Sequence, residues 1–97
     1  MNQNNKNENQ ITIDIPENIV DGVYSNVALV THTGSEFVLD FIHLLPNTTK
    51  AKVRSRVLVA PEHTKRLMLA LKENIAHYEA QFGEIKFPED KNPPFGR

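Results

Sequence analysis

EFVLDFIHLLPNTTKAKVRSRVLVA, residues 36–60, reads as two strands joined by a short loop. Apolar residues recur at every second position in both runs, and this alternation is typical of β-strands. The loop at residues 46–50 contains proline and asparagine, which favour turns. With Leu45 opposite Ala51, the two runs form an antiparallel hairpin with a defined register. The predicted pairs are Phe37 with Val59, Leu39 with Val57, and Phe41 with Ser55.

A third alternating run lies at residues 23–32, directly before this hairpin. Thr33, Gly34 and Ser35 form a short glycine-containing loop, which is typical of a second hairpin. If His32 lies opposite Glu36, the predicted pairs are Leu29 with Leu39 and Val27 with Phe41. The sequence therefore predicts three long strands in one antiparallel sheet.

One face of this predicted sheet is apolar along all three strands, as a sheet that packs against a helix requires. By the registers above, its members are Val23, Val27, Leu29, Phe37, Leu39, Phe41, Val53, Val57 and Val59.

A helix is predicted between Pro61, which suits a first helical position, and Gly83, which suits the position just past a helix end. At the spacing of an α-helix, five apolar side chains form one stripe with Met68 at its border, and the stripe is expected to cover the apolar sheet face. Leu69 points away from it. The stripe consists of Leu67, Leu71, Ile75, Tyr78 and Phe82.

The two ends of the chain are polar. Residues 1–10 are almost entirely Asn, Gln, Lys and Glu, and residues 88–97 are polar and proline-rich, so both are predicted to be disordered tails. Residues 11–15 alternate isoleucine with polar residues and are predicted to form a short strand at the sheet edge. The expected fold is a single α+β domain at residues 11–87. It consists of a four-stranded antiparallel sheet, made of three long strands and a short N-terminal one, with one C-terminal helix packed on one face.

Composition excludes several classes of site. The chain has no cysteine, and its four histidines are not spaced as metal ligands, so we expect no metal, no cofactor and no catalytic residues. Ser25 and His43 are predicted cross-strand neighbours, but no carboxylate is placed to orient the histidine, so they are interpreted as a polar end of the core. Without a secretory signal or a long apolar segment, we expect a cytoplasmic protein with no membrane partner. No small-molecule substrate is inferred.

The second face of the predicted sheet is apolar too, although a single helix can cover only one face. We therefore expect a non-enzymatic interaction module that self-associates through this face, as a homodimer. Two alternatives stay open: residues 11–15 and 85–87 wrap over the face within one chain, or the face stays open for a partner protein or an unfolded chain. The candidate interface residues are Tyr24, Val30, Val38, Ile42, Leu44, Leu58 and Leu69.

Basic residues concentrate in the second half of the chain. Residues 49–97 contain ten basic and six acidic residues, whereas residues 1–48 contain one and six. Alternation places three of the basic residues on one strand face at a spacing of about 7 Å, so nucleic-acid binding is the alternative function, with Tyr24 as a stacking residue. The competing interpretation is that Arg56 pairs with Asp40 and that the basic row protects a sheet edge. The candidate anion-binding residues are Lys50, Lys52, Arg54 and Arg56.

The segments SEFVLDF (residues 35–41) and AKVRSRVLVAPEHTKRLMLALKENIAHYEAQFG (51–83) resemble a family of short bacterial and archaeal proteins known only as a domain of unknown function. The resemblance covers about residues 11–87. It implies a free-standing cytoplasmic domain of about 100 residues and brings no assigned catalytic or binding residues. The order of strands and helix is also similar to that of the export chaperone SecB and of PUR-type nucleic-acid-binding repeats, but in topology only.

Overall fold

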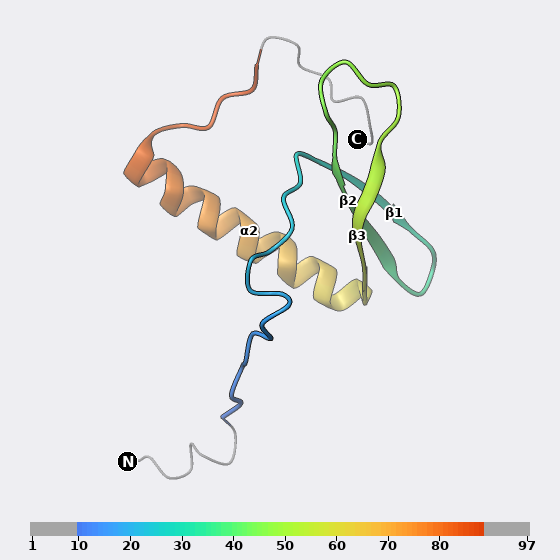
Figure 1. Ribbon diagram of the computed structural model, residues 1–97. Helices are drawn as coiled ribbons and strands as arrows, with labels where there is room; N and C mark the ends of the chain where they lie inside the picture. The colour runs from blue at the N-terminus through green and yellow to red at the C-terminus, as the bar shows by residue number, and fades with distance from the viewer. Residues whose placement is uncertain (1–9, 89–97) are drawn as a thin grey trace.

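The computed structural model describes residues 10–88 and has an α+β architecture (Figure 1). The strands β1 (Val27–His32), β2 (Phe37–His43) and β3 (Lys52–Val59) form one antiparallel sheet in the order β1-β2-β3. The helix α2 (Pro61–Phe82) follows β3 after one residue. The predicted tails at 1–10 and 88–97 lie, apart from one residue each, outside the described residues.

The β2–β3 hairpin has the predicted register over most of its length. Phe37 pairs with Val59, Leu39 with Val57 and Phe41 with Ser55, as the loop at residues 46–50 predicts. The register then shifts by one residue, because Ile42 pairs with Val53 rather than with Arg54. Arg54 is therefore the extra residue of a β-bulge, a device that bends a strand and redirects its side chains.

The β1–β2 hairpin differs from the prediction by one residue. Leu29 pairs with Asp40 and Val30 pairs with Leu39. The turn is shorter than the sequence suggests: the Thr33 N–H donates to the Glu36 carbonyl oxygen at 3.0 Å, so only Gly34 and Ser35 form the loop. The Thr33 hydroxyl oxygen also accepts from the N–H groups of Ser35 and Glu36, at 3.1 and 3.3 Å, which stabilises the tight turn.

A one-residue change of register moves every side chain of a strand to the other sheet face. Val27 and Leu29, predicted to lie with Phe37 and Leu39, are therefore on the opposite face. We call the side that α2 approaches the helix-side face; it carries Ala28, Val30, His32, Phe37, Leu39, Phe41, His43, Lys52, Ser55, Val57 and Val59. The other, the far face, carries Val27, Leu29, Thr31, Val38, Asp40, Ile42, Val53, Arg56 and Leu58.

The predicted N-terminal strand is absent from the structure. Residues 10–26 form no strand, and the side chains of Ile11 and Ile13 are each 83% exposed. After residue 15 the chain turns: the Pro16 carbonyl oxygen accepts from the N–H groups of Ile19 and Val20 at 2.9 and 3.1 Å. Within the described residues the sheet thus has three strands rather than four, because the isoleucine alternation alone supplies no partner strand.

The helix has the predicted bounds. Ala60 makes no side-chain cap, and the Thr64 hydroxyl instead donates to the Ala60 carbonyl oxygen at 2.8 Å. At the other end, Gly83 has φ 101° and its N–H donates to the Glu79 carbonyl oxygen at 2.9 Å.

The position of the helix differs from the expected one. Figure 1 shows α2 starting at the end of β3 and running past the sheet, so that its second half extends away from the strands. No residue of α2 is buried, and among the described residues only Ile42 and Val59, at 5% and 7% exposure, are buried apolar side chains. The helix therefore approaches one face of the sheet without closing over it, and the two elements do not enclose a core in the single chain.

Gly83→Ala tests the helix end. An alanine at φ 101° is strained, so we expect a loss of stability on the order of 1–3 kcal/mol in urea denaturation. Gly34→Ala is the matched control, because an added Cβ there meets no atom within 4 Å and Gly34 has no positive φ. Its effect should stay within about 0.5 kcal/mol. Equal losses in both variants would contradict this interpretation of the helix end.

Candidate functional site

An open apolar groove lies between α2 and the helix-side face of the sheet. It has a volume of about 530 Å³. Val30 and Leu39 line it from neighbouring strands, because the observed register pairs these two residues. The helix lines it with the first three residues of the predicted stripe, Leu67, Leu71 and Ile75, and with three residues beside that stripe, Thr64, Met68 and Lys72.

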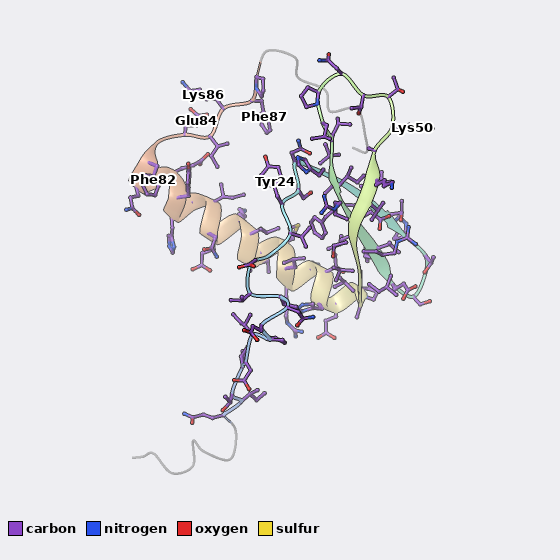
Figure 2. All side chains as sticks on the ribbon, in the orientation of Figure 1. Tyr24, Lys50, Phe82, Glu84, Lys86 and Phe87 are labelled. Carbon is purple, nitrogen blue, oxygen red and sulfur yellow. The ribbon has the colours of Figure 1, made fainter. Side chains whose placement is uncertain are left out.

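The stripe of α2 continues beyond the groove. Tyr78 and Phe82 lie with their ring centroids 5.0 Å apart, and both remain more than half exposed. Figure 2 shows Phe82 at the end of the helix that is distant from the sheet, followed by Glu84, Lys86 and Phe87. The groove is therefore open at one end, where it merges with an exposed apolar helix surface.

The described segments at residues 11–15 and 85–87 do not cover these apolar surfaces. Ile85 is fixed near the helix end, since its N–H donates to a Glu79 carboxylate oxygen at 3.0 Å, yet its side chain is exposed. Phe87 and the isoleucines of residues 11–15 are exposed as well. The alternative in which both segments wrap over the sheet is not what the single chain adopts.

On the far face, Asp40 and Arg56 form a cross-strand ion pair. Arg56 donates from Nε to Oδ1 at 2.7 Å and from Nη2 to Oδ2 at 2.9 Å, while Asp40 is only 3% exposed. These hydrogen bonds lower the pKa of Asp40 below its ordinary value, and the positive charge of Arg56 adds to the effect, whereas desolvation opposes both. The same hydrogen bonds raise the pKa of Arg56. A two-bond pair of this kind fixes the orientation of both side chains.

The interface residues predicted from the sequence do not gather on one face. Tyr24 lies next to His43, and Val30 lines the groove on the helix-side face. Ile42 is buried on the far face, and Leu58 is exposed there. Val38 is half-buried on the far face, and Leu44 is half-buried just past the end of β2. Leu69 is exposed on α2.

The basic residues are split by the bulge at Arg54. Arg56 faces Asp40, whereas Lys50, Lys52 and Arg54 line a separate concavity of about 380 Å³ together with His43 and Leu45. We call this the basic concavity. Figure 2 shows Lys50 at the loop end of the β2–β3 hairpin. The prediction that Lys52, Arg54 and Arg56 share one face is therefore wrong. Arg56 keeps its predicted place opposite Asp40, whereas the bulge at Arg54 moves Lys52 to the helix-side face, opposite His43.

An anchored aromatic ring flanks the basic concavity. The Tyr24 ring lies edge-on to that of His43, with centroids 5.0 Å apart and an interplanar angle of 75°. The following residues hold this segment against the end of β2: the Asn26 amide donates to the Leu44 carbonyl oxygen at 3.0 Å, and its oxygen accepts from the Leu44 N–H at 2.8 Å.

Ser25 is part of the same anchor rather than a nucleophile beside His43. Its Oγ lies 2.9 Å from the Val27 carbonyl oxygen and 3.0 Å from that of Ile42. Sequence reasoning did not include His43 in the basic site, because it placed Tyr24 and His43 on different faces. A two-residue turn at Gly34 and Ser35, in place of the predicted three-residue turn, would have placed Tyr24 and His43 on the same face.

Neither metal binding nor membrane crossing gains support from the described residues. Within residues 10–88, no three His, Asp or Glu side chains gather as metal ligands. In the same part of the chain, no helix has the length and apolar composition needed to cross a bilayer.

Comparison with known proteins returns one family. Residues 1–87 match the family described as "Protein of unknown function (DUF3467)". No curated protein and no solved structure matches the chain. The match covers the whole sheet, the helix and the segment that follows it, so it shows membership while assigning no activity.

The Asp40–Arg56 pair predicts how stability depends on pH in two variants. Since the pKa of Asp40 is lowered by folding, its stabilisation is complete above the unfolded pKa of about 3.9 and is lost as the pH falls through the folded value. Asp40→Asn should remove this acid-dependent loss. Arg56→Met leaves a buried carboxyl without its donor, so burial should raise its pKa, and stability relative to wild type should improve as the pH falls from about 7 to about 4.

Urea midpoints at several pH values and one protein concentration measure this difference. Arg54→Met is the matched control, an arginine two residues away on the same strand and outside the ion pair. It should keep the wild-type pH profile. A parallel profile for Arg56→Met and wild type would contradict a structural role for the pair.

Proposed function

The chain belongs to the DUF3467 family, and from its open apolar groove we propose that it is a non-enzymatic interaction module that assembles with a second copy of itself. The supporting observation is the amount of apolar surface that one chain leaves uncovered. Across the described residues, two apolar side chains are buried, whereas the helix stripe from Met68 to Phe82 is about half exposed. A domain of this size needs a larger buried core to be stable, and a partner can supply it.

The shape of the groove favours a long occupant over a small molecule. A ligand pocket is closed on most sides and carries a few polar groups that orient the ligand. Here the lining is almost entirely apolar, and the stripe runs on past the groove through Tyr78 and Phe82. From Leu67 to Phe82 it extends over roughly 22 Å of helix, a length suited to another helix or strand.

A second copy of the chain is the occupant with matching chemistry. Each chain offers an exposed apolar helix stripe and an incompletely covered apolar sheet face, so two chains related by a two-fold axis can each fill the groove of the other. Contacts of this kind are rich in apolar area, as homodimer interfaces are, and a standard interface buries roughly 800 Å² per partner. In such a dimer, a helix of the partner packs on the helix-side face, where the sequence predicts the chain's own helix, and the contact differs from the second-face contact expected from the sequence.

The N-terminal segment fits the same assembly. Residues 11–15 carry isoleucines in alternation, all exposed, and the outer edges of β1 and β3 have no partner strand among the described residues. We propose that this segment pairs with a sheet edge in the dimer as the fourth, short strand. The exposed isoleucines would then gain a surface to pack on, and an open sheet edge would be protected.

Two leucines of α2 test which surface makes the contact. Leu71 lines the groove and is 54% exposed, whereas Leu69 is 55% exposed but lies roughly 200° away around the helix axis. Wild type should sediment as a dimer at micromolar concentration. Leu71→Glu should shift it to monomer and lower its thermal stability, because it places a charge in the apolar contact; Leu69→Glu should sediment as wild type does.

The other outcomes separate the alternatives. Disruption by Leu69→Glu alone would move the contact to the opposite side of the helix. A wild-type monomer that is stably folded at these concentrations would overturn self-association. If that monomer also suppressed the aggregation of a chemically unfolded protein, and Leu71→Glu abolished this, the groove would be a site for unfolded chains.

A further inference from the structure

We propose that the basic concavity at the bulged end of the β2–β3 hairpin is a binding site for the backbone of single-stranded nucleic acid, with Tyr24 as the residue on which a base stacks. This site is separate from the apolar groove. No residue lines both surfaces, so the inference does not depend on self-association.

Charge is the first reason. Residues 41–61 contain four basic side chains and no acidic one. Arg56 is engaged with Asp40 across the sheet, whereas Lys50, Lys52 and Arg54 form no ion pair among the described residues. Three positive charges thus converge on one concavity that no carboxylate lines. A cluster of this kind attracts phosphate groups, and it does so most strongly at low ionic strength.

The bulge at Arg54 is the second reason. A regular strand would place Arg54 and Arg56 on the same face, two residues apart. The register shift instead leaves Arg56 opposite Asp40 and turns Arg54 toward Lys52 and His43. Bulges that redirect a side chain are frequent next to functional sites. One arginine therefore stabilises the sheet while the other joins the basic concavity.

The anchored aromatic ring is the third reason, and it favours a single strand. Proteins that bind single strands combine a basic surface with aromatic side chains on which bases stack. Tyr24 is 67% exposed, and its ring contacts His43, which itself lines the concavity. The hydrogen bonds of Ser25 and Asn26 fix its backbone to the end of β2, so the exposed ring is held in position before any ligand binds. In duplex DNA the bases are already stacked on each other and cannot use this ring.

Fluorescence anisotropy with a labelled oligothymidylate of about 20 nucleotides tests the proposal, since this length exceeds the roughly 4–16 nucleotides of a typical site. We expect binding whose affinity falls roughly 15- to 20-fold between about 50 and 200 mM salt, as three phosphate contacts predict for a single strand. The combined variant Lys50→Gln, Lys52→Gln, Arg54→Gln should abolish binding and flatten the salt dependence. It should keep the wild-type sedimentation, because none of these residues lines the groove.

Matched variants separate the site from general charge effects. Lys65→Gln, Arg66→Gln, Lys86→Gln removes the same charge from α2 and the segment after it, and it should leave affinity within about twofold. Tyr24→Leu should weaken binding by about tenfold and Tyr24→Phe should preserve it, since stacking needs the ring and not the hydroxyl. A duplex of equal length should bind more weakly than the single strand.

Three results would overturn the proposal. The first is no binding at about 50 mM salt. The second is equal weakening by the two charge-removing variants, which would indicate a diffuse electrostatic attraction. The third is an inorganic polyphosphate chain that competes as well as the oligonucleotide while Tyr24→Leu has no effect, because the site would then recognise phosphate alone.

Discussion

The buried carboxylate of Asp40 is the constraint on which the rest of the sheet depends. Asp40 lies at the centre of the middle strand and is almost inaccessible to water, so its charge must have a partner. Arg56 supplies two hydrogen bonds from the directly opposite position of β3. A shift of the pairing by one residue would place Asp40 opposite Ser55 or Val57 and leave the charge without this partner. The pair thus selects one register for β2 and β3 out of several that apolar alternation alone permits.

The bulge next to this pair explains why the basic residues do not act together. Ile42 points to the far face, and it is one of two buried apolar side chains among residues 10–88. Since Ile42 pairs with Val53, one residue of β3 must remain outside the ladder, and that residue is Arg54. Without the bulge Ile42 would lie opposite Arg54; with it, the ion pair and the apolar Ile42–Val53 pair both lie on the far face. The sequence pattern of alternating cations contains no sign of this conflict.

Local sequence signals predict the β2–β3 turn and the bounds of the helix correctly. They fail where the prediction concerns how β1 pairs with β2 or how the helix packs on the sheet. The turn at residues 46–50 placed Phe37 opposite Val59, and Pro61 with Gly83 bounded the helix; the structure confirms both. The turn from Thr33 to Glu36 is one residue shorter than the sequence pattern predicts, because its closure depends on a threonine side chain that accepts two backbone hydrogen bonds. This single difference moved Tyr24 and Val30 to the helix-side face. The strand expected at residues 11–15 and the helix expected to cover the sheet differ from the structure for another reason. An amphipathic pattern shows that an apolar surface must be covered, but it does not show which element covers it.

The corrected register places both candidate surfaces on the same side of the sheet. Along β2, the helix-side face runs from Phe37 and Leu39, at the apolar groove, to His43, at the basic concavity. The two sites are thus at opposite ends of one strand, connected by Phe41. A partner that fills the groove covers the apolar end, where α2 begins, while the charged end at Lys50 and Lys52 has a high desolvation cost if it is buried without anions. The helix-side face therefore has two separate binding surfaces. The apolar groove is unfavourable for an anion, and the basic concavity is unfavourable for an apolar partner.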